Sequence, residues 1–287
     1  MDFQKSLVEI IPQRYSCRSY LKEPIDSATQ QRLANFMDAS PVGPLGTPLR
    51  FKLLAATEDD RQSLRGLGTY GFIRGATGFI VGAMRPAKKN LEDFGYQMEA
   101  VILKATELGL GTCWLGGSFT QSSFSRQFGR GKEETIPAVT ATGYPSPRSR
   151  SSLIRKQVRG DYRLPWEHLF IHARTGIPLT PESAGPYRLP LEMLRLAPSA
   201  SNKQPWRVSR GEDGFHFYLQ RTHNSGPGSL SFDLLRLADL QRVDIGIAMC
   251  HFDLTAHELG LGGQWAVLTT GVEPAEAGME YVASWVE

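Results

Sequence analysis

The sequence carries one segment twice. Residues 93–114 and 244–265 align without a gap at an offset of 151, and 11 of the 22 positions are identical, including both copies of ELGLG. This period is far longer than the 20–50 residues typical of solenoid repeats, so it indicates a duplicated domain. A chain of 287 residues has room for two domains of roughly 100–150 residues each. The sequence therefore predicts two related halves.

Helix and strand patterns alternate around the repeat in both halves. The helix-like segments are 3–13, 27–38, 90–108, 189–197 and 240–259. The strand-like segments are 50–56, 78–84, 136–144, 206–219, 264–272 and 280–286. Between the halves lies a basic stretch with six Lys or Arg and one acid in residues 146–163. We expect an α+β protein with half one over 1–145, a basic linker crossing between the halves over 146–182, and half two over 183–287.

The two repeated helices are apolar on more than one side. Gly95 and Gly246 occupy equivalent positions, and alanines recur on both helices. Because small residues let two helix backbones approach closely, we expect these helices to pack on each other about a pseudo-twofold axis, as in a symmetric dimer. The alternative is two independent domains joined by the linker.

Composition limits the classes of protein that this chain can represent. The net charge is +3, which is too weak to favour a nucleic-acid binder. The three cysteines are odd in number and far apart, which is typical of a reducing compartment. The N-terminus does not resemble a signal peptide, and no apolar run approaches the roughly 20 residues that span a bilayer. We therefore expect a cytoplasmic protein without membrane, nucleic-acid or metal partners.

The first polar motif is the stretch from Arg14 to Arg18, which follows the first helix. On an extended chain, side chains alternate between faces, so Arg14, Ser16 and Arg18 project together. Two guanidinium groups and a hydroxyl on one face can bind a phosphate or carboxylate. The alternative for the motif alone is a solvated basic edge strand.

The second polar motif is the loop 198–206, with the sequence PSASNKQPW. Its hydroxyls, amides and ammonium can surround a polyol or phosphate with short hydrogen bonds. The alternative is a turn in which Ser and Asn satisfy the local backbone. The corresponding loop of half one, residues 39–50, has lost every amide. Turn-forming amides would be expected in both copies, so their asymmetry favours a binding role.

The third motif is the glycine-rich stretch 109–117, directly after the first repeated helix. Glycines let a ligand approach the backbone closely, and the N–H groups of Gly116 and Gly117 can face the edge of a planar heterocycle. Cys113 within the stretch is interpreted as a buried structural thiol rather than a nucleophile, since no basic neighbour is visible in the sequence. A GxGxxG pattern at 66–71 follows a polar stretch instead of a strand, so it is not a dinucleotide-binding turn.

Together these motifs resemble the FMN-dependent nitroreductase family. The matching patterns are RxSxR near the N-terminus, PSxxNxQPW in a loop and GLGTCW after a central helix. The two-half layout resembles the branch called putative TM nitroreductases, in which one chain carries both halves. The resemblance implies a three-layer α/β/α sandwich with the two halves as an intrachain pseudo-dimer. It also implies one FMN per chain, because only half one has RxSxR and only half two has SxxNxQ, so the mirror site would be inactive.

The resemblance also assigns roles. Arg14 and Ser16 would bind the phosphate and ribityl end, Arg18 would lie near flavin N1 and O2, and the Gly116 N–H would face N5. Arg163, before Leu-Pro, would be a further phosphate ligand. Asp161 stands where the family has a second basic residue, so Arg155 or Arg159 would substitute. The remaining residues placed around the cofactor are Tyr15, Trp114, Leu115, Gly117, Pro198, Ser199, Ala200, Ser201, Asn202 and Gln204.

The activity implied is hydride transfer from NAD(P)H through FMN to a small organic acceptor such as a nitroaromatic or quinone. No protein acid or base is required for it. Tyr70, Phe72 and Trp206 are candidates for the wall of the substrate pocket. We expect a monomer or a weak homodimer. The alternatives are a non-catalytic flavin-binding or sensor protein, and a scaffold or nucleic-acid module that uses the basic residues 148–163.

Overall fold

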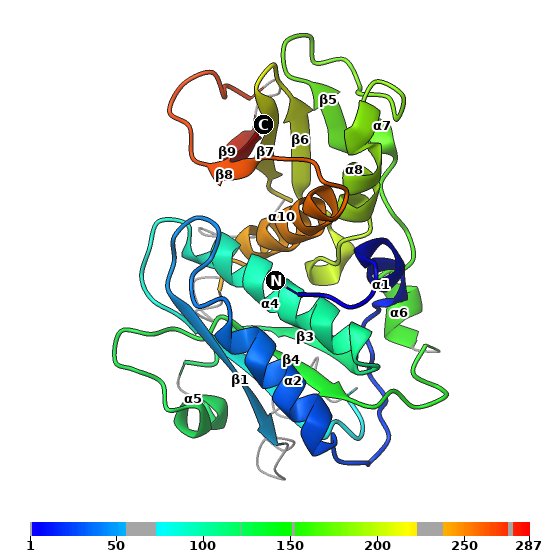
Figure 1. Cartoon of the computed structure of the whole chain (residues 1–287), viewed down its shortest axis with the longest axis vertical. Helices are drawn as coiled ribbons and strands as arrows, with labels where there is room; N and C mark the ends of the chain where they lie inside the picture. The colour runs from blue at the N-terminus through cyan, green and yellow to red at the C-terminus, as the bar shows by residue number, and fades with distance from the viewer. Residues whose placement is uncertain (1, 56–72, 121, 151–152, 223–237, 275–277) are drawn as a thin grey trace.

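Two β-sheets with the same strand order form the framework of the protein (Figure 1). The computed structural model describes residues 2–55, 73–120, 122–150, 153–222, 238–274 and 278–287. The first sheet has the order β1-β2-β4-β3, with β1 Leu49–Ala55, β2 Gly78–Met84, β3 Gly111–Gly116 and β4 Ala138–Gly143. The second has the order β5-β6-β7-β9-β8, with β5 Phe170–His172, β6 Trp206–Arg210, β7 Gly214–Gln220, β8 Gln264–Ala266 and β9 Met279–Val286. Without β5, the two orders are equivalent, which confirms the duplication.

Helices separate and cover the sheets. In half one they are α1 Leu7–Gln13, α2 Ser27–Asp38, α4 Asn90–Glu107 and α5 Ser123–Phe128. In the linker and half two they are α6 Leu153–Gln157, α7 Trp166–Leu169, α8 Arg188–Arg195 and α10 Leu240–Glu258, with short 3₁₀ turns η1 Gly185–Tyr187 and η2 Ala200–Asn202. Helices α4 and α10 cross at the centre of the molecule, between the two sheets (Figure 1). No helix in these described ranges is long and apolar enough to cross a bilayer.

The repeated sequence ends both central helices in the same way. Gly109 and Gly260 adopt left-handed φ angles of 81° and 71°. The next residue in each copy donates its N–H five residues back, from Leu110 to Ala105 O and from Leu261 to Ala256 O, both at 2.9 Å. This is the Schellman motif, which explains why ELGLG is a strong stop signal for a helix.

Most of the core is shared between the halves. Phe94 of α4 and Phe252 of α10 are fully buried in one hydrophobic cluster that includes both central helices and strands of both sheets. A second cluster covers the other face of the first sheet, where Phe79 of β2 packs edge-on against Phe124 of α5 with ring centroids 5.0 Å apart. The first sheet therefore lies between α4 and α5, the predicted α/β/α arrangement. The shared core excludes two independent domains.

The linker contains structure that periodicity does not predict. It forms α6 and α7, and β5 then pairs in parallel with β6, placing Phe170 opposite Val208. Residues assigned to the linker thus complete the sheet of half two. Other predicted boundaries shift modestly: the first helix begins at Leu7, because the Ser6 hydroxyl accepts from Val8 N, and the strand predicted over 264–272 ends at Ala266.

Candidate functional site

The arginine motif of half one lies beside the glycine-rich strand. Ser16 forms a parallel bridge with Thr112 of β3, and Cys17 N donates to Thr112 O at 2.8 Å. Tyr15 and Cys17 pack into the second hydrophobic cluster, so the alternating residues Arg14 and Arg18 belong to the other face. Two motifs separated by about a hundred residues in sequence are therefore neighbours in the fold.

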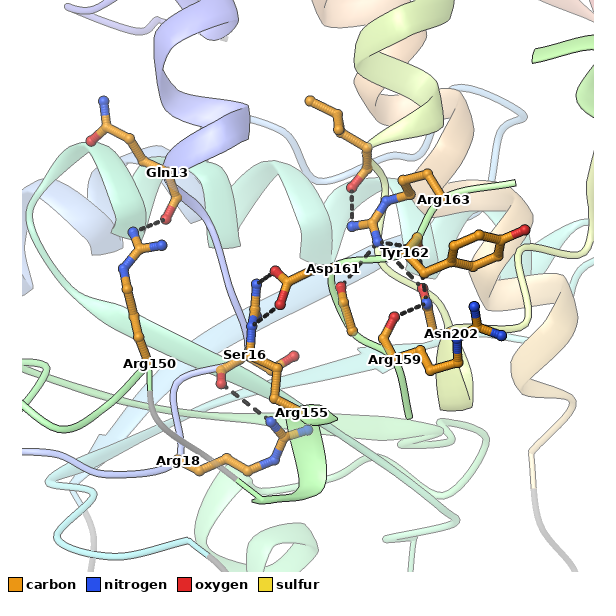
Figure 2. A network of polar contacts seen from close by, with 12 residues as sticks. Gln13, Ser16, Arg18, Arg150, Arg155, Arg159, Asp161, Tyr162, Arg163 and Asn202 are labelled. Carbon is orange, nitrogen blue, oxygen red and sulfur yellow. Dashed lines mark hydrogen bonds and ion pairs between the residues drawn. The ribbon is translucent and has the colours of Figure 1, made fainter. Parts of the chain in front are cut away.

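The linker brings further arginines to this place. Arg150 lies over the ring of Tyr15, 4.2 Å from its centroid, and Arg155 lies 6.0 Å from the same centroid. Arg159 lies 4.5 Å from the centroid of Tyr162. Figure 2 shows the arginines of the linker and Arg18 in the same region as Ser16 and Asn202. Positive charge from two segments, the N-terminal motif and the linker, therefore converges on one region.

The loop of half two has an unusual backbone. Ser201, Asn202 and Gln204 have φ angles of 51°, 57° and 52°, a left-handed region that non-glycine residues rarely adopt. The Ser199 hydroxyl accepts from Gln204 N at 2.9 Å, and the buried Asp244 carboxylate accepts from Ala200 N at 2.9 Å. Such strain persists where the surrounding structure enforces it, and it is concentrated at functional sites.

The two amides of this loop bind the linker backbone. Asn202 Nδ2 donates to Arg159 O at 2.8 Å and to Tyr162 O at 3.0 Å. Gln204 Oε1 accepts from Leu164 N at 2.8 Å. The amides therefore fix the segment 159–164 that carries Arg159 and Arg163. The sequence left two interpretations of this loop, a local turn or a binding loop. Ser199 behaves as a turn residue, whereas the amides of Asn202 and Gln204 bind a different segment.

Arg163 is held by neutral partners. Its guanidinium donates to Gly160 O at 3.1 Å and Leu196 O at 3.0 Å, and it approaches Asn202 Oδ1 at 3.5 Å. Burial, followed by the positive charges of Arg14 and Arg155, lowers the pKa of Arg163 to about 10. A lowered arginine pKa means that the local environment disfavours the cation, so an anion bound here would relieve it.

Arg14 is the most deeply buried cation of the cluster. Burial lowers its pKa, partly opposed by the Glu99 carboxylate, whose Oε1 lies 3.6 Å from Arg14 Nε. The Nε–H groups of Arg14 and Arg163 are both buried, and neither donates a hydrogen bond to any acceptor within the described residues. Buried donors without acceptors are costly. Two such donors in one cationic cluster fit a bound phosphate group.

Asp161 is the acid that faces this cluster. Its carboxylate accepts two hydrogen bonds from Arg155, which lower the pKa of Asp161. The side chain of Asp161 is 78% exposed, so the ion pair is screened by water and weak. Asp161 therefore competes with an anion for Arg155 but does not enter the buried part of the site.

The glycine-rich strand contacts both halves. Trp114 Nε1 donates to Glu99 Oε2 at 2.8 Å, whereas Leu115 is buried in the cluster on the opposite face of the sheet. A Cβ atom on Gly116 would lie 2.3 Å from Leu240 Cδ1, at the start of α10. Gly117 has a φ of 146°. Gly116 thus lies directly against half two, and a larger residue there would require the Leu240 side chain to move.

The structure brings the predicted residues of the two halves to one place through Arg163, which contacts Asn202 directly and interacts electrostatically with Arg14. Pro198 is half-buried at the start of the loop. Trp206, suggested for a pocket wall, is fully buried in the main core. Tyr70, Phe72 and the GxGxxG pattern at 66–71 lie outside the described residues.

Two residues at the site were missed by sequence reasoning. Glu99 and His251 lie on the two repeated helices, are fully buried and contact each other. In the sequence, each is a titratable residue within a helix that is otherwise apolar on more than one side, and this could have marked it as unusual. Its role, however, can be inferred only once its partner on the other helix is known.

The fold and this site define a two-half α+β protein whose polar motifs converge from both halves. The sequence matches the family described as "Putative TM nitroreductase" over residues 6–256, so the chain belongs to that family. No curated protein matches the chain.

Solved structures resemble the whole chain or one part of it. A structure described as a putative nitroreductase from Thermotoga maritima has 19% identity and a TM-score of 0.62, covering 100% of this chain and 95% of its own. It therefore shares the full two-half fold. A nitroreductase in complex with FMN from Desulfovibrio desulfuricans has 22% identity and a TM-score of 0.42, covering 52% of this chain and 92% of its own. A nitroreductase with bound FMN from Desulfitobacterium hafniense has 20% identity and a TM-score of 0.40, covering 50% and 91%.

Proposed function

We propose that this protein is an FMN-dependent oxidoreductase that transfers hydride from NAD(P)H to a small organic acceptor such as a nitroaromatic or a quinone. The family to which the chain belongs supports oxidoreductase chemistry. The observation that carries the proposal is the cationic cluster in which the buried Nε–H groups of Arg14 and Arg163 donate no hydrogen bond within the described part of the chain. A phosphate ester supplies the acceptors and the negative charge that both guanidinium groups need.

The residues divide the work of binding. Arg14, Arg163 and Arg155 would hold the phosphate, and Ser16 the ribityl end. Arg18, whose Nη1 donates to Ser16 O at 3.3 Å, would place its charge beside the flavin N1 and O2 edge. A cation there stabilises negative charge on the ring. FMN, when bound, supplies the hydride chemistry itself.

The half-two loop acts on the linker in this proposal. Asn202 and Gln204 fix the backbone of residues 159–164, and thereby orient Arg163 toward Arg14. Ser199 and Ser201 would provide hydroxyls near the cofactor, with Ser201 exposed at the turn. Binding at the junction makes the site dependent on both halves. Each chain would bind one FMN, since half two lacks an RxSxR motif.

The visible spectrum of the purified protein tests the proposal. A flavin spectrum that is bleached anaerobically by NADH or NADPH supports the oxidoreductase. A flavin spectrum that neither donor bleaches favours the alternative, a non-catalytic flavin-binding protein. Protein that is colourless and does not bind added FMN would contradict both.

A further inference from the structure

Glu99 and His251 are a buried pair that the proposed flavin chemistry does not use. Both side chains are 0% exposed, and Glu99 Oε1 on α4 lies 3.1 Å from His251 Nε2 on α10. Through its other oxygen Glu99 accepts from Trp114, and its Oε1 also faces Arg14. The pair thus joins half two to two residues of the candidate site.

The hydrogen bonds determine how many protons the pair holds. His251 Nδ1 lies 2.9 Å from Met193 O. A carbonyl oxygen only accepts, so Nδ1 carries a proton. A second proton must then lie between Nε2 and Glu99 Oε1, because two lone pairs would otherwise face each other. The pair is either imidazolium with carboxylate or imidazole with carboxylic acid, and both forms have no net charge.

This neutrality matters for Arg14. A lone carboxylate 3.6 Å from Arg14 Nε would cancel its positive charge. A carboxylate that shares a proton with His251 still orients the guanidinium and Trp114, yet it leaves the cluster with a net positive charge. Arg14 therefore stays available to an anion although an acid lies beside it.

The pair exists on one side of the molecule. Under the offset of 151, Glu99 corresponds to Cys250 and His251 corresponds to Ala100, so the mirror position has neither group. Burying an ionisable pair is costly, and apolar residues of similar volume often serve stability as well or better. The Glu99–His251 pair is present only on the side that carries the arginine cluster, which indicates that it has a role at that cluster.

We propose that Glu99 and His251 are positioning residues for the flavin site, which fix Arg14 and Trp114 against half two without cancelling the charge of Arg14. This inference rests on the proposed function, because it assigns the phosphate of FMN as the anion. The pair does not touch the cofactor and acts through Arg14 and Trp114.

Three variants separate charge from packing. In Glu99→Gln, the amide oxygen accepts from Trp114 and the amide N–H donates to neutral His251, so the pair stays neutral. In His251→Gln, an N–H still reaches Glu99, but the shared proton is lost and a full carboxylate faces Arg14. The double variant Glu99→Gln/His251→Gln removes that carboxylate. Asp253→Asn is the control, because Asp253 accepts from Tyr96 and Trp265 at the same interface without contacting Arg14.

The affinities for FMN and for riboflavin, which lacks the phosphate, are measured by fluorescence titration. We expect His251→Gln to bind FMN roughly tenfold more weakly with riboflavin affinity unchanged. Asp253→Asn should remain within about threefold of wild type, whereas Glu99→Gln and the double variant, which leave no full carboxylate beside Arg14, should both bind FMN more tightly than His251→Gln. A merely structural pair predicts that the double variant is the weakest binder of FMN, and that result would overturn the proposal, as would FMN affinity unchanged in His251→Gln.

The protonation of the two His251 ring nitrogens can be measured independently by ¹⁵N NMR of histidine-labelled wild-type protein. This measurement requires neither a folded variant nor bound flavin. His251 should show a protonated Nδ1, as imidazolium or as the Nδ1–H tautomer. A spectrum with Nδ1 unprotonated overturns the shared proton. Wild-type protein that binds no FMN overturns the proposed function and the positioning role with it, whatever the histidine spectrum shows.

Discussion

Gly95 and Gly246 occupy reciprocal positions where α4 and α10 cross. A Cβ atom on Gly95 would lie 2.1 Å from Val243 O, and one on Gly246 would lie 1.9 Å from Glu92 O. The offset of 151 converts each contact into the other, since it relates Gly95 to Gly246 and Glu92 to Val243. Such self-complementary contacts define an isologous interface. The two halves therefore pack as the subunits of a symmetric dimer do, within one chain.

Adding a methyl group at this crossing should destabilise the protein. In Gly246→Ala the new Cβ would meet a backbone carbonyl that cannot move without separating the helices, so we expect a loss of about 3 kcal/mol in the free energy of unfolding. Urea denaturation measures it. Gly262→Ala is the control, because no atom of the described residues lies within 4 Å of a Cβ there. Equal stability of the two variants would contradict the close packing.

Arg163 should discriminate FMN from riboflavin. Arg163→Ala removes a guanidinium whose buried Nε–H finds no acceptor among the residues that the structure describes, so FMN affinity should fall at least tenfold and riboflavin affinity should change little. Fluorescence titration with both flavins measures this. Arg174→Ala, which removes a cation that is 90% exposed, is the control. An equal loss for both flavins would show that Arg163 acts on the fold alone.

The amide of Asn202 can be removed without disturbing the backbone. Both Ser201 and Asn202 have left-handed φ angles, which glycine adopts without strain. Ser201→Gly should therefore be neutral or slightly stabilising. Asn202→Gly should lower the melting temperature and weaken FMN binding, because the bonds to Arg159 O and Tyr162 O are lost. Identical behaviour of the two variants would argue against the role given to the amide.

Glu134 should contribute to stability in a pH-dependent way. Its two hydrogen bonds from Arg50, at 2.8 and 2.6 Å, lower its pKa from 4.5 to about 2 in the folded protein. A lowered folded-state pKa stabilises the protein above the unfolded value, and this stability is lost as the pH falls from about 4.5 toward 2. Because Arg50 is 44% exposed, the pair is worth only about 1 kcal/mol.

Urea denaturation of Glu134→Gln at several pH values tests this. The variant should be less stable than wild type at pH 7, and the difference should shrink as the pH falls below about 4.5. Glu133→Gln, which changes an exposed neighbour, supplies the baseline. A difference between Glu134→Gln and wild type that does not change with pH would exclude the ion pair as its cause.

The three thiols should be unreactive in the folded protein. Cys17, Cys113 and Cys250 are all buried, and burial raises the pKa of each, that of Cys113 to about 11. Since the thiolate is the reactive form, a thiol reagent at pH 8 should label native protein far more slowly than urea-unfolded protein, which exposes three thiols. Rapid labelling of Cys113 in native protein would point to an accessible, functional thiol instead.

Much of the fold could be predicted from the sequence alone. The repeat and its ELGLG ends encode both central helices, because a Schellman stop depends only on residues within one turn. Alternation placed Arg14 and Arg18 opposite the buried Cys17, since the pleat of an extended chain fixes the face of each side chain. Small residues at equivalent positions indicated that the helices pack on each other. These signals are local, and no tertiary contact is needed to recognise them.

The partners of the polar residues were decided only by the tertiary structure. Nothing near Asn202 in the sequence shows that its amide binds the backbone of residues 159–162, or that β5 completes the sheet of half two. Glu99 meets His251 across 152 positions of the chain. The cost of burying these two groups is offset by their contact with each other and by Arg14, Trp114 and the Met193 carbonyl. The role of either residue can therefore be recognised only when the two halves pack together. Propensity and periodicity determine elements, whereas the pairing of distant charges depends on how those elements are brought together.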